Sequence, residues 1–391
     1  MKATAANRLR YQPDSRRGHY ESYFLRANHA HKKQAFWLRY TLFIPAQPNA
    51  HNQPTAEIWA AWFDERGALA VQQDIALNNC RFERQSDACL QLQIGPNTLL
   101  RHGNQQLSVG TAEGQIEQPG KCIRWQLEYR GGDAVLPLFP ESLYERALPK
   151  AKVVTGLPNT RFSGTIWIND DAFLIDDWVG SENHNWGSKH TDEYAWGQVC
   201  GFDNEPDSFL ECATARIKLR PVFSPWFNVA VLRLRGQEYR FNSIRQALCG
   251  RGEYGYFHWS LRSHSGPYQL HIQMQAQAAD VAGLNYRNPP GGSHTCLNTK
   301  VAYCQVTLLH KGTSIATLAS QQRAAFEVAR LRRHAQAAEH RADHGRQCLD
   351  VVRRDIVQPL RRRDHQQLHR AHRAGLPGFG GHQVERLVDA A

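Results

Sequence analysis

The chain has 391 residues, which is enough for two domains that each bury a core of their own. Its ten tryptophans, two methionines and many glycines and prolines favour a β-rich fold over a bundle of long helices. The net charge is +11, but residues 329–391 contain thirteen arginines, no lysine and seven acidic side chains, so the rest carries only +5 and we predict no nucleic-acid partner.

The first residues lack the apolar run that a secretory signal needs, and no stretch of about 18 apolar residues could span a bilayer. The nine cysteines are scattered and form no Cys-x-x-Cys pair, as expected of reduced, buried thiols. We therefore predict a cytoplasmic protein, and leave peripheral contact with the inner membrane open.

Strand-like segments recur at short intervals through the first half of the chain. They cover residues 20–27, 35–44, 57–63, 69–77, 89–94 and 123–129. Within residues 35–44 the apolar side chains alternate, which places Phe36, Leu38 and Tyr40 on one face of a strand. Many short strands joined by tight turns are typical of a barrel or a sandwich.

Proline-rich residues 135–158 interrupt this pattern, and we place a domain boundary there. Further strands are predicted over residues 161–168, 194–202, 209–219, 228–235, 254–261, 268–274 and 301–309. A short helix is predicted over residues 243–248, because Asn242 or Ser243 can cap its start and Gly250 can end it. The predicted organisation is an extension (1–18), two β-domains (19–150 and 151–328) and a basic Arg/His-rich tail (329–391).

The tail offers little apolar surface to offset the entropy of ordering, so we predict that it stays unpacked. A basic arm or a fraying helix is the alternative.

Residues 176–203 are the most informative segment, because they combine three tryptophans and two histidines with several carboxylates. An aromatic wall beside ionisable groups suits recognition of an apolar small molecule and proton chemistry on it. In a strand that begins at Tyr194, the side chains of Tyr194, Trp196 and Gln198 share one face. The alternative is that the tryptophans anchor a core and the polar residues cap turns.

Other motifs argue against a metal or a nucleotide. His184 and His190 have ligand-forming side chains, but their spacing matches no recognised metal signature. Residues 250–255 match the letters Gly-x-Gly-x-x-Gly, yet a helical turn precedes them and a strand follows, the reverse of what a dinucleotide site requires. We predict no metal and no cofactor.

A family resemblance adds to this picture. Tyr20-Glu-Ser-Tyr-Phe-Leu25, Phe36-Trp-Leu-Arg-Tyr-Thr41, Asn183-His-Asn-Trp-Gly187 with Tyr194-Ala-Trp-Gly-Gln198, and the Asn-Pro-Pro-Gly-Gly loop at residues 288–292 resemble the lipocalin-like superfamily of carotenoid 1,2-hydratase (hydroxyneurosporene synthase) and tocopherol cyclase. The resemblance covers residues 19–328 and is closest to an uncharacterised bacterial branch. It implies an all-β fold of two tandem lipocalin/calycin-like antiparallel β-barrel domains with a few short helices, and a hydrophobic ligand such as an isoprenoid.

Two functions follow as hypotheses. The first is binding of a hydrophobic, isoprenoid or lipid-like molecule in a barrel cavity. The alternative is a hydratase or cyclase that protonates an alkene of such a ligand, which needs a protonated carboxylic acid and aromatic faces to stabilise a cation. The candidate catalytic residues are Glu182, Asp192 and His184, with Asp177 as a further possible acid. The candidate ligand-binding residues are Trp178, Asn185, Trp186, His190, Tyr194, Trp196, Gln198 and Tyr286.

Overall fold

The computed structural model describes residues 6–12, 18–49, 52–86, 89–102, 109–219 and 221–329, and for residues 83–86, 89 and 90 it describes the backbone alone. The predicted basic tail lies outside these residues except for Ala329, which ends the last strand. Nearly all regular structure in the described part of the chain is β, so the prediction of an all-β fold is confirmed. Both large sheets belong to one compact unit.

Every strand pair of the first sheet is antiparallel, and the sheet follows the order β4-β3-β2-β1-β12-β11-β9-β8-β7-β6-β5, with β10 paired to β11. Its strands are β1 (His19–Asn28), β2 (Ala35–Ile44), β3 (Thr55–Asp64), β4 (Gly67–Ala76), β5 (Cys80–Ser86), β6 (Cys89–Ile94), β7 (Thr98–Arg101), β8 (Gly110–Gln118), β9 (Lys121–Arg130), β10 (Leu136–Pro137), β11 (Ala151–Ile168) and β12 (Asp171–Gly187). The edge strand β4 contacts β8 and β9, so the sheet curls into a nearly closed barrel, barrel 1.

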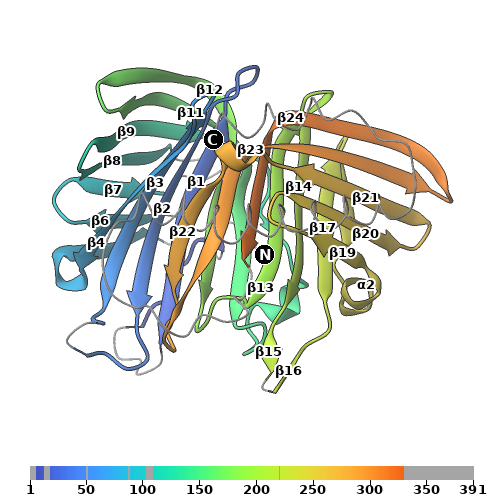
Figure 1. Ribbon diagram of the computed structural model, residues 1–391, viewed down its shortest axis with the longest axis horizontal. Helices are drawn as coiled ribbons and strands as arrows, with labels where there is room; N and C mark the ends of the chain where they lie inside the picture. Colours follow the sequence, from blue (N-terminus) through green and yellow to red (C-terminus); the bar gives the residue numbers. More distant parts are fainter. Residues whose placement is uncertain are drawn as a thin grey trace, which may run out of the picture. The chain divides into compact units, whose positions relative to one another are not determined.

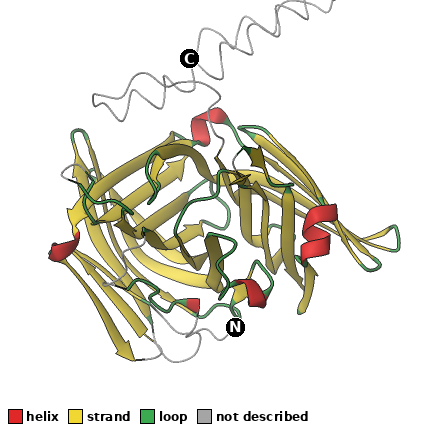
Figure 2. Cartoon of the chain, turned by 90° about the horizontal axis from the view of Figure 1, so that it is seen from below, coloured by secondary structure: helices red, strands yellow, loops and turns green. Residues whose placement is uncertain are grey.

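The second sheet, barrel 2, follows the order β18-β17-β14-β13-β24-β23-β21-β20-β19, with β22 paired to β23. Its strands are β13 (Glu193–Phe202), β14 (Glu205–Arg216), β17 (Phe227–Leu234), β18 (Gln237–Phe241), β19 (Arg251–Tyr254), β20 (His258–Ser265), β21 (Tyr268–Gln275), β22 (Ala282–Arg287), β23 (Ser293–His310) and β24 (Thr313–Ala329). β15 (Lys218–Leu219) and β16 (Val222–Phe223) form a separate small sheet. Figures 1 and 2 show the strands of both sheets curving about their own interiors.

The short helix predicted from its capping residues is present as α2 (Ile244–Cys249). The Ser243 hydroxyl accepts from the backbone N–H of Gln246, and the Gln246 side chain accepts from the backbone N–H of Ser243, which is a complete capping box. The helix contacts β17 and β20, each the second strand from an end of the second sheet.

The two sheets do not divide at residue 150, where the proline-rich connection suggested a boundary. Residues 151–187 form β11 and β12, which pair with β9 and β1 and complete barrel 1. The second sheet begins only at Glu193. The prolines interrupt the alternation of apolar residues without ending the sheet, because the long β11–β12 hairpin returns to pair with the first strand of the chain.

Strands β1 to β3 are buried on both faces, and this property positions the site. One face of each strand lines the core of barrel 1, which includes Tyr23, Phe36 and Ile58. The opposite face contributes to a second core shared with barrel 2, in which Trp37 and Trp59 lie among residues such as Phe209. Burial on both faces explains why β2 and β3 read as nearly continuous apolar runs, whereas β1 is equally buried but carries Glu21, Ser22 and Arg26.

Candidate functional site

The antiparallel pair β1–β12 is the scaffold of the candidate site, because alternate residues of a strand point to opposite faces of the sheet. In this pair Tyr23 lies directly opposite His184, and Leu25 lies opposite Glu182. Tyr23 and Leu25 belong to the core of barrel 1, so their partners Glu182 and His184 project into the same interior. Two ionisable side chains predicted to be catalytic are thus brought to one end of barrel 1.

Glu21, two residues before Tyr23 on the same face of β1, is fully buried and accepts five hydrogen bonds. The donors are the backbone N–H groups of Arg10 and Tyr11, both at 2.7 Å, and the side chains of His19 at 3.1 Å, Tyr23 at 3.0 Å and His184 at 2.9 Å. Burial alone would raise the pKa of Glu21, but the hydrogen bonds from His184 and His19 outweigh it and lower the pKa to about 2. Glu21 is therefore a carboxylate at neutral pH.

His184 lies between two oxygen acceptors. Its Nε2 is 2.9 Å from Glu21 Oε1, and its Nδ1 is 2.6 Å from the carbonyl oxygen of Ala6. Burial lowers the pKa of His184, and the hydrogen bond to Glu21 opposes that shift. Only a ring that carries a proton on both nitrogens can satisfy both contacts, so the geometry favours an imidazolium paired with the Glu21 carboxylate.

Glu182 is the second buried carboxylate of this interior. It accepts hydrogen bonds from the Tyr129 hydroxyl and the Asn7 side-chain amide, and its Oε2 is 3.1 Å from Nδ1 of His102. Tyr129 comes from β9, and His102 directly follows β7. Each of the two carboxylates therefore touches both an imidazole and a phenol.

Tyr23 joins the two halves of this arrangement. Its ring stacks on His184 with 4.2 Å between centroids and an interplanar angle of 9°, and it lies 4.7 Å from the ring of His102. Burial first, and then the neighbouring Glu21 carboxylate, raises the pKa of Tyr23 well above its usual value, so the phenol keeps its proton. We call this group, Glu21, Tyr23, His102, Tyr129, Glu182 and His184, the acid-base cluster.

Residues 6–12, which we call the strap, lie against the acid-base cluster. Besides the contacts of Ala6, Asn7, Arg10 and Tyr11 given above, Leu9 packs against the core of barrel 1. The Arg10 guanidinium lies over the ring of Trp186, 4.6 Å from its centroid, and 3.5 Å from the carboxylate of Glu145, whose side chain is 76% exposed. The strap thus covers the cluster and supplies much of its hydrogen bonding.

The other face of β12 points into the layer between the barrels. Gln198 is fully buried there, donates to Thr155 and Asn183, and accepts from Ser181. Beside it, Glu211 accepts a hydrogen bond of 2.9 Å from Thr155 and one of 3.1 Å from the indole N–H of Trp196. Burial raises the pKa of Glu211 to about 7. Trp196 and Gln198 share one face, as predicted.

Three further residues predicted to bind ligand gather at the edge of the same layer. The ring of His190 stacks on Tyr20 at 3.8 Å and on Tyr286 at 5.6 Å. The guanidinium of Arg39 lies 4.2 Å from the centroid of Tyr286, and the Tyr194 hydroxyl donates to Cys296 Sγ at 3.3 Å. His190 and His184 therefore lie in different clusters and do not face a common point.

The three tryptophans of residues 176–203 do not form one aromatic wall, contrary to the expectation from their proximity in sequence. Trp178 lies in the core of barrel 1, Trp186 packs with Ala6 and Tyr144, and Trp196 lies in the core between the barrels. Trp178 and Trp186 share one face of β12 but lie eight residues apart along it, and the turn between β12 and β13 carries Trp196 into the second sheet.

The remaining predicted residues lie away from the acid-base cluster. Asp177 is exposed and forms an ion pair of 3.0 Å with Arg161. Asp192 is paired at 2.5 Å with Lys189 and accepts from the backbone N–H of Lys218. Asn185 follows His184 and points to the opposite face, with its side-chain oxygen buried. We therefore leave Asp177 and Asp192 out of the site.

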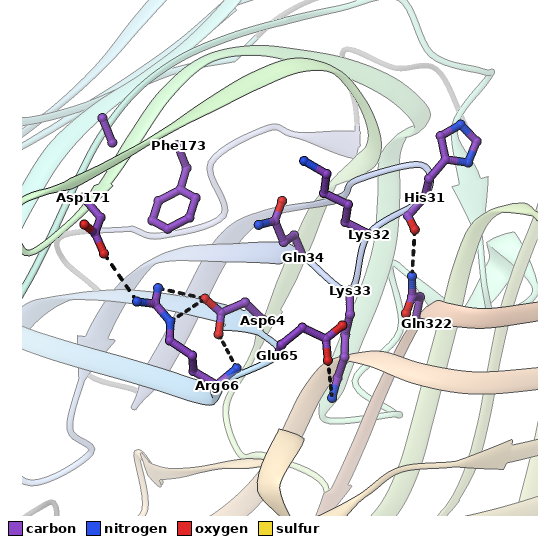
Figure 3. Close-up of a pocket in the computed structure, with 11 residues that line it drawn as sticks. His31, Lys32, Lys33, Gln34, Asp64, Glu65, Arg66, Asp171, Phe173 and Gln322 are labelled. Carbon is purple, nitrogen blue, oxygen red and sulfur yellow. Dashed lines mark hydrogen bonds and ion pairs between the residues drawn. The ribbon is translucent and has the colours of Figure 1, made fainter.

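A large open cleft is found at the other end of barrel 1. It has a volume of about 840 Å³ and is lined by the β1–β2 and β3–β4 turns and the start of β12, as Figure 3 shows. Its charges pair with one another: Arg66 contacts Asp64 at 2.9 Å and Asp171 at 3.3 Å. Phe173 is the only aromatic hydrocarbon ring among its lining residues, so the cleft does not match the expected apolar cavity.

Four cluster residues escaped the sequence analysis, namely Glu21, Tyr23, His102 and Tyr129. Glu21 and Tyr23 lie on the inward face of β1, and an ionisable residue on the inward face of a buried strand is the pattern that could have identified them. Tyr129 and His102 are brought in by pairing between strands distant in sequence, which no local pattern reveals. Glu211, within an apolar stretch of β14, was missed in the same way.

Within the described ranges, no helix has the length and hydropathy needed to span a bilayer. The same residues contain no group of three or more His, Cys, Asp or Glu side chains arranged to hold a metal ion.

No protein-family model matches the chain. Two curated relatives, both described as uncharacterized proteins of Mycobacterium tuberculosis (strains CDC 1551 / Oshkosh and ATCC 25618 / H37Rv), are 27% identical to it over 203 residues. The match covers 51% of this chain, and the chain spans only 60% of the length of these relatives.

Two solved structures are similar in part. The crystal structure of a candidate AttH protein of Nitrosomonas europaea has 14% identity and a TM-score of 0.49, over 82% of this chain and 94% of that one. Kievitone hydratase from Nectria haematococca has 10% identity and a TM-score of 0.47, over 82% of this chain and 90% of that one.

Proposed function

We propose that barrel 1 binds a small molecule with a largely apolar body at the acid-base cluster and adds water to a carbon–carbon double bond of that molecule. One observation carries the proposal: two buried carboxylates, Glu21 and Glu182, each contact an imidazole and a phenol at one end of an otherwise apolar interior. Buried ionisable groups concentrated in this way are typical of sites that move protons.

Hydration requires an acid and a base that act on the same ligand. A proton forms a bond to one carbon of the double bond, and water supplies the hydroxyl group to the other carbon while a base takes the second proton of that water. His184, held by the Glu21 carboxylate, would deliver the proton. Glu182, oriented by Tyr129 and adjacent to His102, would receive the proton from water.

The interior next to the cluster suits the apolar body of the ligand. The ring of Tyr129 stacks on Phe162 with 5.2 Å between centroids, and Phe162 meets Phe36 edge to face at 5.3 Å. These rings offer the faces that stabilise positive charge developing on carbon. The reaction class also agrees with the resemblance to the carotenoid 1,2-hydratase family, although the isoprenoid ligand it implies has no support from these contacts.

Binding without chemistry is the second candidate, and one observation favours it. Glu21 has a pKa of about 2 and five hydrogen-bond donors, so it is a weak base whose role is to fix the orientation of its neighbours. A protein that only binds its ligand would need Glu21 to orient the neighbouring side chains and would need no proton transfer.

The two candidates are separated by incubating the full-length protein with 4-vinylphenol, a soluble phenolic alkene, and measuring by liquid chromatography and mass spectrometry the product that has gained one water. We expect turnover that Glu182→Gln and His184→Gln lower by about 10²- to 10⁴-fold, the usual contribution of a general acid or base. Asp192→Asn is the matched control, since Asp192 is a carboxylate outside the cluster. Binding of 4-vinylphenol with no product would favour the second candidate, and equal turnover in all variants would exclude the cluster.

A further inference from the structure

The strap identifies the kind of ligand that the acid-base cluster accepts, because it fills the hydrogen-bonding positions that a ligand would take. The carbonyl oxygen of Ala6 accepts from His184, and the Asn7 amide donates to Glu182. The backbone N–H groups of Arg10 and Tyr11 donate to the two oxygens of Glu21. The carbonyl oxygen of Asn7 also accepts from the Tyr23 hydroxyl at 3.4 Å, so the strap offers two acceptors and three donors to buried groups.

These contacts cannot be removed without replacement. Each hydrogen bond that a buried carboxylate loses without replacement lowers the equilibrium constant for folding by about tenfold or more. A pure hydrocarbon that displaced the strap would leave Glu21 and Glu182 without the donors of Arg10, Tyr11 and Asn7. A ligand that brings its own donors and acceptor would exchange one set of bonds for another at little cost.

The attachment of the strap is compatible with such an exchange. Apart from its contacts with the cluster, the strap is held by Leu9 against the core of barrel 1 and by Arg10 over Trp186. Ala6 is also buried beside Trp186, and the ring of Tyr11 stacks on that of His19 at 6.3 Å. The ion pair of Arg10 is with Glu145, which is exposed to solvent, and exposed ion pairs of this kind contribute little. Arg8, two residues before Arg10 in the strap, is exposed.

We propose that the ligand of barrel 1 carries a carbonyl or hydroxyl acceptor and at least two hydrogen-bond donors, and that it enters by replacing residues 6–12. This inference rests on the proposed function, since it names the substrate class of the same cluster. It replaces the expectation of an isoprenoid or lipid-like ligand with that of a polar-substituted one.

The test compares three probes by titration calorimetry on the full-length protein: methyl 3,4-dihydroxycinnamate, its 3,4-dimethoxy analogue and methyl cinnamate. We expect the dihydroxy probe to bind at least about tenfold more tightly than either of the others, because only it supplies two hydroxyl donors. Hydrogen exchange followed by mass spectrometry should show faster exchange of the Arg10 and Tyr11 amides when that probe is bound, since the strap has left Glu21.

Arg10→Ala weakens the strap and should tighten binding of the dihydroxy probe severalfold, because a larger fraction of the protein is then open. Arg8→Ala is the matched control and should bind as the wild type does. Equal affinity for the three probes, binding without faster exchange at Arg10 and Tyr11, or no binding to either wild type or Arg10→Ala would each overturn the inference. Tight binding with strap release but no hydration of the probe would count against the proposed catalysis alone.

Discussion

Replacing Glu211 by glutamine should make the protein more stable at alkaline pH while changing little at acidic pH. Glu211 is fully buried between the barrels, and its pKa is raised by burial from an ordinary 4.5 to about 7. Between these values the folded protein keeps a proton that the unfolded chain has lost, so stability falls as the pH rises through this window. Each pKa unit corresponds to about 1.4 kcal/mol, so the loss above pH 7 amounts to about 3 kcal/mol.

Glutamine has the shape of the protonated acid and fits the same partners. Its oxygen can accept from the Trp196 indole, and its amide can donate to the hydroxyl of Thr155, which can in turn donate to Asn183. We therefore expect Glu211→Gln to exceed the wild type in stability by about 1 kcal/mol at pH 5 and by about 3 kcal/mol at pH 8.

Urea unfolding of both proteins at pH 5 and pH 8 measures this difference directly. Groups that titrate identically in both proteins cancel when the two pH values are compared. Glu253→Gln, at an exposed position of barrel 2, is the matched control and should show no change between the two pH values. The reasoning fails if Glu211→Gln changes stability by the same amount at pH 5 and pH 8.

Two further predictions concern the acid-base cluster. The pKa of Glu21 is lowered from 4.5 to about 2, so its contribution of about 3 kcal/mol to the free energy of unfolding is present above pH 4.5 and is lost as the pH falls towards 2. Glu21→Gln should therefore be less stable than the wild type at pH 7, and its stability should fall less steeply between pH 4.5 and pH 2. An equally steep fall in both proteins would contradict this. Gly110 lies opposite Tyr129, and a Cβ there would be 2.1 Å from the ring of Tyr129. Gly110→Ala should therefore displace that ring from Glu182 and lower the free energy of unfolding, measured in urea, by about 1–3 kcal/mol. Wild-type stability in this variant would show that the ring can move freely.

Much of the fold followed from alternation along single strands. The pattern of residues 35–44 correctly placed Phe36, Leu38 and Tyr40 on the inner face, and Ser243 correctly located the start of α2. Local patterns are sufficient for such features because the side-chain period of a strand and the cap of a helix depend only on near neighbours.

The division of the chain between sheets did not follow from local patterns. The return of β11–β12 to β1 joins residues more than a hundred positions apart, and nothing near residue 150 encodes it.

The candidate site was predicted in part, and for a related reason. Glu182 and His184 were selected from a segment rich in functional side chains, and the structure brings these two together. Their partners Glu21 and Tyr129 belong to strands that lie far away in sequence. Strand alternation also sent the selected residues to two different faces, so a single dense segment contributes to the acid-base cluster and to the layer between the barrels.

The double burial of β1 to β3 has a consequence for dissecting the molecule. A fragment ending at Gly187 would retain every strand of barrel 1, yet it would present the indoles of Trp37 and Trp59 to water together with Phe24. Apolar patches of this kind promote self-association in isolated domains. Expressed alone, the first half of the described chain should therefore aggregate, and co-expression with the second half should rescue its solubility.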